Sequence, residues 1–134
     1  MLIYLSVFLF ISTLLSWIFL VIRYSKKKTI SKEKIILFTR LLKSSTAQVS
    51  SKEKIINYDK LYHKILNELW YAWTFGEALK LEPKEIINRD KIWKLHKLRN
   101  KIVHDFDSYE ERYLQLQSQE YEKEIQKLLK WISE

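Results

Sequence analysis

The chain contains almost no residues that interrupt helices: its 134 residues include one glycine, Gly76, and one proline, Pro83. Glycine loses conformational entropy inside a helix, and proline lacks the amide hydrogen that a helix needs. The remaining sequence is rich in Leu, Ile, Lys and Glu. We therefore predict an all-α fold, with about 110 residues beyond the first 25 forming one ordinary domain.

The first part of the chain is an uncharged apolar run from Leu2 to Ile22, LIYLSVFLFISTLLSWIFLVI. At about 1.5 Å per helical residue, this run would span the roughly 30 Å hydrocarbon core of a bilayer. A cleaved signal peptide is the alternative, but no basic segment precedes the run and no small-x-small site follows it. We therefore predict a transmembrane anchor over residues 1–23 in a single-pass protein of the cell membrane.

The net charge of +8 is concentrated directly after that run. Between Arg23 and Lys43 there are eight Lys or Arg and one acid, Glu33, whereas the chain from Ser44 onward carries sixteen basic and fifteen acidic residues. A basic flank marks the cytoplasmic side of a membrane helix and attracts anionic lipid. This pattern predicts an outside N-terminus, a cytoplasmic C-terminal domain and the lipid bilayer as a partner, and net charge alone argues only weakly for RNA binding.

The rest of the chain divides into a basic juxtamembrane helix with a hinge, over 24–50, and a helical domain over 51–134. Ser31 can cap a helix that runs to about Lys43, and the small polar stretch 44–51 is typical of a hinge. Beyond it, apolar residues recur at helical spacing in three segments. Their stripes are Ile55, Tyr58, Tyr62, Leu66, Leu69 and Trp73; Ile92, Leu95, Ile102 and Phe106; and Tyr121, Ile125, Leu128, Leu129 and Ile132.

Polar residues mark where these helices should begin. Thr74 can cap a short helix that Pro83 closes, Asn88 can cap the helix that runs to about His104, and Ser118 can cap the last helix. The long helix after Ser51 is expected to run to about residue 73. The domain should therefore be a small bundle of four to five helices.

Two charged residues interrupt the apolar stripes. Arg99 lies near the middle of the stripe on its helix, and Asp59 lies at the edge of the apolar arc on the earlier long helix. Burying a charge is costly unless the charge is paired. The pattern therefore predicts either a structural ion pair between Asp59 and Arg99 or a functional role for Arg99.

Arg99, Asn100 and His104 lie within LHKLRNKIVHDFD, residues 95–107. This arrangement resembles the R-x(4-6)-H motif of the HEPN superfamily, and IINYDKLYHKILNELW and TFGEALK look like the first helices of HEPN-like domains that follow a single membrane helix. The resemblance covers roughly residues 52–132. It implies a metal-independent endoribonuclease that acts on RNA as a homodimer, without a cofactor. Arg99, Asn100 and His104 would be its catalytic residues.

In that reaction a ribose 2′-OH would attack the adjacent phosphorus. His104 would serve as general base or acid, Arg99 would stabilise charge on the phosphoryl oxygens, and Asn100 would orient the phosphate or the imidazole. However, His104 follows Arg99 by five residues, about 140° round an ideal helix. Both can reach one site only if the helix unwinds or a second subunit supplies one of them.

Other histidines and lysines have plainer explanations. His96, Asn100 and His104 recur at intervals of four residues, but two histidines without a suitably spaced carboxylate make a poor zinc site, and no metal is predicted. His63 is expected on a solvated helix face. Lys94, Lys97 and Lys101 share an outward face that could follow a phosphate backbone or simply be solvated.

Two further functions remain open. The chain could be a noncatalytic helical module that docks another membrane or cytoplasmic protein through aromatic residues such as Trp70, Tyr71 and Trp73. It could also be a small subunit of a membrane complex whose basic linker binds anionic lipid.

Overall fold

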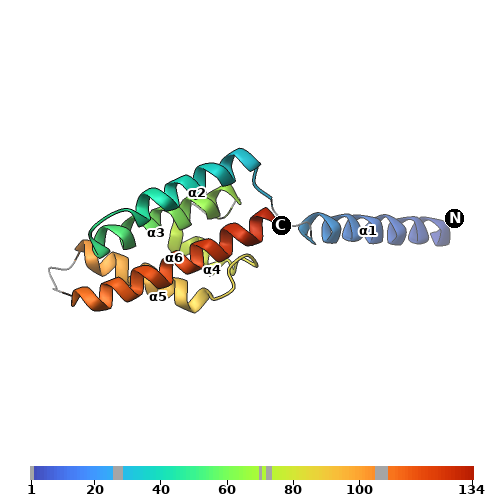
Figure 1. The fold of residues 1–134 in the computed structure, drawn as a ribbon. Coiled ribbons are helices and arrows are strands. Elements are labelled where there is room, and N and C mark those ends of the chain that lie inside the picture. Colours follow the sequence, from blue (N-terminus) through green and yellow to red (C-terminus); the bar gives the residue numbers. More distant parts are fainter. Residues whose placement is uncertain (1, 26–28, 70, 72–73, 105–108) are drawn as a thin grey trace.

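The computed structural model describes residues 2–25, 29–69, 71, 74–104 and 109–134 (Figure 1). Over these residues every regular element is a helix, so the predicted all-α fold is confirmed. The helices are α1 (Leu2–Ser25), α2 (Lys32–Thr46), α3 (Ser51–Glu68), α4 (Phe75–Lys80), α5 (Arg89–His104) and α6 (Glu111–Ser133).

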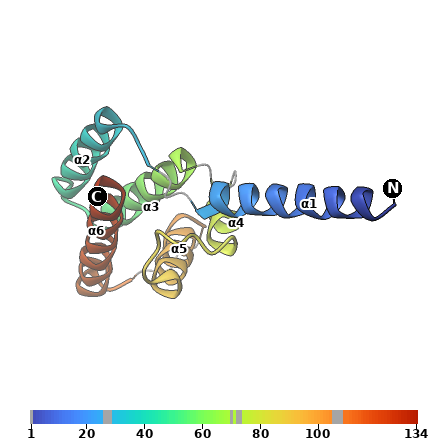
Figure 2. The same cartoon turned by 90° about the vertical axis from the view of Figure 1, so that its right-hand side faces the viewer.

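Helix α3 is the centre of the bundle and packs against α2, α5 and α6 (Figures 1 and 2). Its apolar stripe explains this position, because Ile55, Tyr58, Tyr62 and Leu66 are all almost completely buried. The Tyr121 ring of α6 packs against the rings of Tyr58 and Tyr62, at centroid distances of 6.3 and 6.1 Å. The short helix α4 packs against α5.

Helix α2 contributes to the same core as the helices that follow it. Phe38 and Leu42 are buried, and the Thr46 and Tyr58 hydroxyls are hydrogen bonded at 3.1 Å. The segment expected to be a hinge is shorter than 44–51, because α2 continues to Thr46 and Ser50 caps α3 through the amide of Glu53. The bundle therefore begins at α2, within the segment assigned by sequence to a juxtamembrane helix.

The predicted caps are partly confirmed. The side chains of Ser31, Thr74 and Asn88 each accept a hydrogen bond from a backbone amide in the first turn of the following helix. Ser118, in contrast, does not begin a helix: it is buried inside α6, and its hydroxyl donates to the Gln115 carbonyl. The helix begins earlier because Leu114 adds another turn to the buried stripe of α6.

The predicted extent of α3 is also corrected. The helix ends at Glu68 rather than near residue 73, with Leu69 as its C-cap. The amide of Tyr71 donates to the Leu66 carbonyl and so folds the chain back at this end. Trp70, Trp73 and Phe106, expected to be apolar contacts, lie outside the described residues.

The predicted membrane anchor is contradicted by the structure. Helix α1 projects away from the bundle (Figures 1 and 2). No helix in the described part of the chain is both long and apolar enough to cross a bilayer. The single-pass topology and the membrane location inferred from residues 1–23 are corrected accordingly, whereas the bilayer as a partner stays a prediction.

Candidate functional site

A buried carboxylate, that of Asp59, lies where α3, α5 and α6 meet. Its side chain is 5% exposed. The Tyr121 hydroxyl of α6 donates to Asp59 Oδ1 at 2.9 Å, and His96 Nδ1 of α5 lies 2.9 Å from the same oxygen. Arg99 Nε of α5 lies 3.5 Å from Oδ2. One carboxylate thus links three helices, and its charge is balanced by a guanidinium on the neighbouring helix.

The side chains around Asp59 form a closed ring of polar contacts. Because a carboxylate only accepts, His96 Nδ1 carries the hydrogen that points at Asp59, and His96 Nε2 is left as an acceptor. Asn100 Nδ2 lies 3.3 Å from that Nε2 and donates to it. Arg99 Nη1 donates to Asn100 Oδ1 at 2.9 Å, and the ion pair of Arg99 with Asp59 closes the ring.

The spacing of these residues on α5 produces this arrangement. His96 precedes Arg99 by three residues and Asn100 by four, so the three side chains share one face of the helix. That face borders Ile92 and Leu95, which are buried and pack α5 against the rest of the bundle. Packing of the apolar stripe therefore brings the polar side chains up to Asp59.

The Arg99 side chain is more exposed than that of Asp59. Its side chain is 24% exposed, and its Nε is buried without a hydrogen-bond partner among the described residues. The 3.5 Å contact with Asp59 Oδ2 is therefore an ion-pair contact rather than a hydrogen bond. Among the described residues, Tyr121 and His96 supply the hydrogen bonds that Asp59 accepts from side chains.

His63 extends the cluster along α3, one turn after Asp59. Its ring stacks on Phe75 at a centroid distance of 5.5 Å, and Phe75 also contacts the His96 ring at 4.7 Å. Burial lowers the pKa of His63, with a further lowering from His96 and an opposing effect from Asp59. The predicted solvated position is thus wrong, because Phe75 of α4 covers this part of α3.

The three predicted catalytic residues do not converge within the chain. Arg99 and Asn100 lie together in the Asp59 ring. His104 is the last residue of α5 and is exposed, and no hydrogen bond or ion pair joins it to either residue within the described ranges. The offset of about 140° between positions 99 and 104 persists because α5 stays helical to its end.

Sequence reasoning missed His96, Tyr121 and His63 as members of this cluster. Each lies at a helical spacing that could have indicated it: His96 shares a face with Arg99 and Asn100, and His63 follows Asp59 by four residues. Tyr121 was expected only as an apolar core residue, and burial together with its bond to Asp59 raises its hydroxyl pKa well above the ordinary value.

The hydrogen bonds within the Asp59 ring engage the groups that catalysis would need. Both imidazole nitrogens of His96 have partners, so neither is free to take a proton from a substrate hydroxyl. Within the described residues, no group of three or more His, Asp or Glu side chains could hold a metal ion. The arrangement is suited to fixing α5 against α3 and α6.

No protein-family model, curated protein or solved structure matches this chain. The resemblance to the HEPN superfamily is therefore contradicted, since no family model supports it. The geometry supplies a physical reason, because Arg99 is engaged with Asp59 while His104 lies apart on the surface.

The outward face of α5 carries an exposed row of cations. Lys94, Lys97 and Lys101 are exposed, and no ion pair in the described part of the chain involves any of them. Lys91, by contrast, contacts Glu120 at 2.7 Å and Glu124 at 3.8 Å. His104 follows Lys97 by seven residues and extends the same face. We call Lys94, Lys97, Lys101 and His104 the basic face of α5.

Proposed function

We propose that the bundle binds RNA through the basic face of α5 and does not cleave it. The observation that supports this function best is that Lys94, Lys97 and Lys101 are exposed and without acidic partners among the described residues. Lysines three and seven residues apart lie along about 10 Å of one helix face. Such a row can contact successive phosphates of a nucleic-acid strand.

The Asp59 ring gives this face a fixed orientation. A helix that binds a phosphate backbone needs its cations held in place, because ordering a mobile surface on binding costs free energy. Asp59, Tyr121 and His96 join α5 to two other helices on the side opposite the lysines. In this proposal Arg99 and Asn100 have a structural role in the ring.

Binding without cleavage follows from the positions of the histidines. His96 has no free nitrogen, and His104 is separated from Arg99. A general base and a group that stabilises phosphoryl charge must reach the same phosphate. A homodimer stays a prediction, and RNA binding by one copy does not depend on it.

The test measures the affinity of the full chain for a fluorescein-labelled single-stranded uridine decamer by fluorescence anisotropy, as a function of salt. The K94Q/K97Q/K101Q variant should bind at least about tenfold more weakly. Its plot of log affinity against log salt should be shallower by roughly 2, since each phosphate contact on a single strand contributes about 0.7.

A matched variant controls for net charge. K52Q/K60Q/K64Q removes the same number of positive charges from exposed positions of α3. It should retain the affinity of the original chain. Equal losses in the two variants, or no salt-dependent binding by the unmodified chain, would contradict the proposal.

Two further arms address the alternatives. The decamer should remain intact after prolonged incubation, and fragments that disappear with His104→Ala would replace binding by cleavage. An acidic peptide of equal charge should compete poorly with RNA. A peptide that binds as tightly as RNA would instead favour a protein-docking module.

A further inference from the structure

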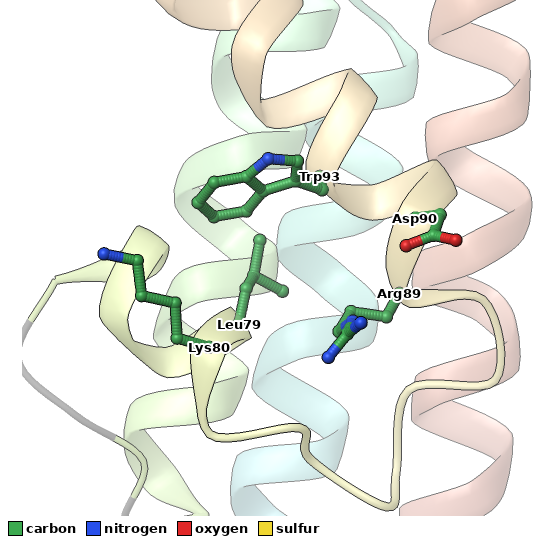
Figure 3. A pocket seen from close by; sticks show the side chains of 5 residues that line it. All are labelled: Leu79, Lys80, Arg89, Asp90 and Trp93. Carbon is green, nitrogen blue, oxygen red and sulfur yellow. The ribbon is translucent and has the colours of Figure 1, made fainter.

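A cavity of about 360 Å³ lies between the end of α4 and the first turn of α5 (Figure 3). Leu79 and Lys80 line it from α4, and Arg89, Asp90 and Trp93 line it from α5. Pockets that hold small ligands have volumes of roughly 300–1,000 Å³. The cavity is therefore large enough for one planar ring system and too small for an extended ligand.

Trp93 provides an aromatic wall of the cavity. A Cβ added at Gly76 would lie 3.6 Å from Trp93 Cη2, so the edge of the indole lies close to the first turn of α4. The Trp93 ring lies 6.1 Å from the His96 ring, and Lys97 Nζ lies 5.4 Å from its centroid. An indole that borders a cavity is suited to stacking with a nucleobase.

The polar lining of the cavity has one unpaired acid. Arg89 is hydrogen bonded to Glu82, whereas Asp90 is exposed and has no ion pair within the described residues. A carboxylate accepts hydrogen bonds through two oxygens. Among the four RNA bases, only guanine presents two adjacent N–H donors on its Watson–Crick edge, which is the edge that proteins read in unpaired RNA.

The cavity is continuous with the basic face of α5. Asp90 precedes Lys94 by four residues and Lys97 by seven, so these side chains follow one another along the same side of the helix. Lys80 of α4 adds an exposed cation on the far side of the cavity, where it has no ion pair among the described residues (Figure 3). A strand that lies along the lysines would therefore deliver a base to Trp93 and Asp90.

We propose that this cavity binds a guanine base of the strand that lies on α5. This inference rests on the proposed RNA binding and names its base preference. The guanine ring stacks on Trp93, and its N1–H and N2–H groups donate to the Asp90 carboxylate. The adjacent phosphates contact Lys94 and Lys97.

The experiment compares three labelled decamers bound by the full chain: all uridine, uridine with one central guanosine, and uridine with inosine at that position. Inosine lacks only the N2 amino group. The guanosine decamer should bind about 5- to 150-fold more tightly than all-uridine RNA, which is the range for stacking one base. The inosine decamer should bind at least about fivefold more weakly than the guanosine decamer, because a hydrogen bond to a charged acceptor is removed.

Two variants assign the preference to the cavity. Asp90→Asn replaces an exposed side chain by one of nearly equal size, and it should remove the difference between guanosine and inosine. Glu53→Gln, at an exposed acid on α3, is the matched control and should retain that difference. Trp93→Leu should reduce the binding of the guanosine decamer to that of all-uridine RNA.

Failure of this inference is distinguishable from failure of the proposed function. Equal, salt-dependent binding of all three decamers by the unmodified chain would overturn the guanine site and leave RNA binding intact. Binding of none of them would overturn both. Free GMP that binds as tightly as the guanosine decamer would overturn the strand-bound site, because the lysines of α5 would then add nothing.

Discussion

Replacing Arg99 by Met tests how the buried charge of Asp59 is stabilised. The variant keeps most of the apolar stem of the side chain and removes the guanidinium. It thereby loses the hydrogen bond to Asn100 and the 3.5 Å contact with Asp59 Oδ2. Asp59 nevertheless keeps its hydrogen bonds from Tyr121 and His96.

The two donors that Asp59 keeps determine how much unfolding free energy Arg99→Met should lose. Removing the only partner of a buried charge costs about 3–5 kcal/mol of unfolding free energy. Because Asp59 is not left alone, Arg99→Met should cost less, about 1.5–3 kcal/mol, which is the range for losing a hydrogen bond that involves a charged group. Asp59→Ala should reach about 3–5 kcal/mol, because it removes the carboxylate that accepts from Tyr121 and His96 and balances the charge of Arg99.

The assay is urea-induced unfolding of the full chain, followed by far-UV circular dichroism at neutral pH. Equal slopes with denaturant for all variants would show that the comparison concerns stability alone. The double variant should cost little more than Asp59→Ala, because Arg99 loses its role in the ring once the carboxylate is absent.

Two results would refute this reasoning. If Arg99→Met destabilises the chain as much as Asp59→Ala does, then Asp59 depends on Arg99 and not on Tyr121 and His96. If the two single losses add in the double variant, the guanidinium and the carboxylate are not energetically coupled.

Two further predictions concern α4 and its neighbours. Gly76→Ala should raise the free energy of unfolding by about 0.5–1 kcal/mol, because alanine favours the helix and its Cβ would meet Trp93 at an ordinary contact distance of 3.6 Å; a lower urea midpoint would contradict this. His63→Phe should make stability less dependent on pH. The pKa of His63 is lowered in the folded state, so the unfolded chain binds more protons and the original chain loses stability as pH falls below about 6.5. Urea unfolding at about pH 7.5 and about pH 5 measures how much unfolding free energy is lost as pH falls. Equal losses in the original chain and in His63→Phe would show that His63 does not cause the pH dependence.

Local sequence patterns predicted much of the fold. Thr74 and Asn88 cap helices as expected, because a cap depends on residues within one turn. The start of α6 was misplaced at Ser118 because a buried Ser in a helix and an N-cap Ser look alike in sequence. Leu114 decides between them, and its burial depends on contacts with other helices.

The candidate site was predictable only in part, for a related reason. The apolar pattern singled out Asp59 and Arg99 as charges on buried faces, and the structure places Arg99 Nε 3.5 Å from Asp59 Oδ2. The pattern did not indicate His96 or Tyr121 as further partners. A hydrogen bond requires atoms to lie within a few tenths of an ångström of their ideal separation, and helical periodicity does not specify how far one helix slides along another.

The sequence alone thus determined that this chain forms helices, because its scarcity of glycine and proline and its apolar spacing act within each segment. Tertiary structure alone decided which polar groups meet. The polar contacts of Asp59 combine side chains from α3, α5 and α6, and the cavity beside Trp93 is lined by residues of both α4 and α5. Both depend on the positions in which whole helices pack, which are set by the sum of many apolar contacts rather than by any local motif.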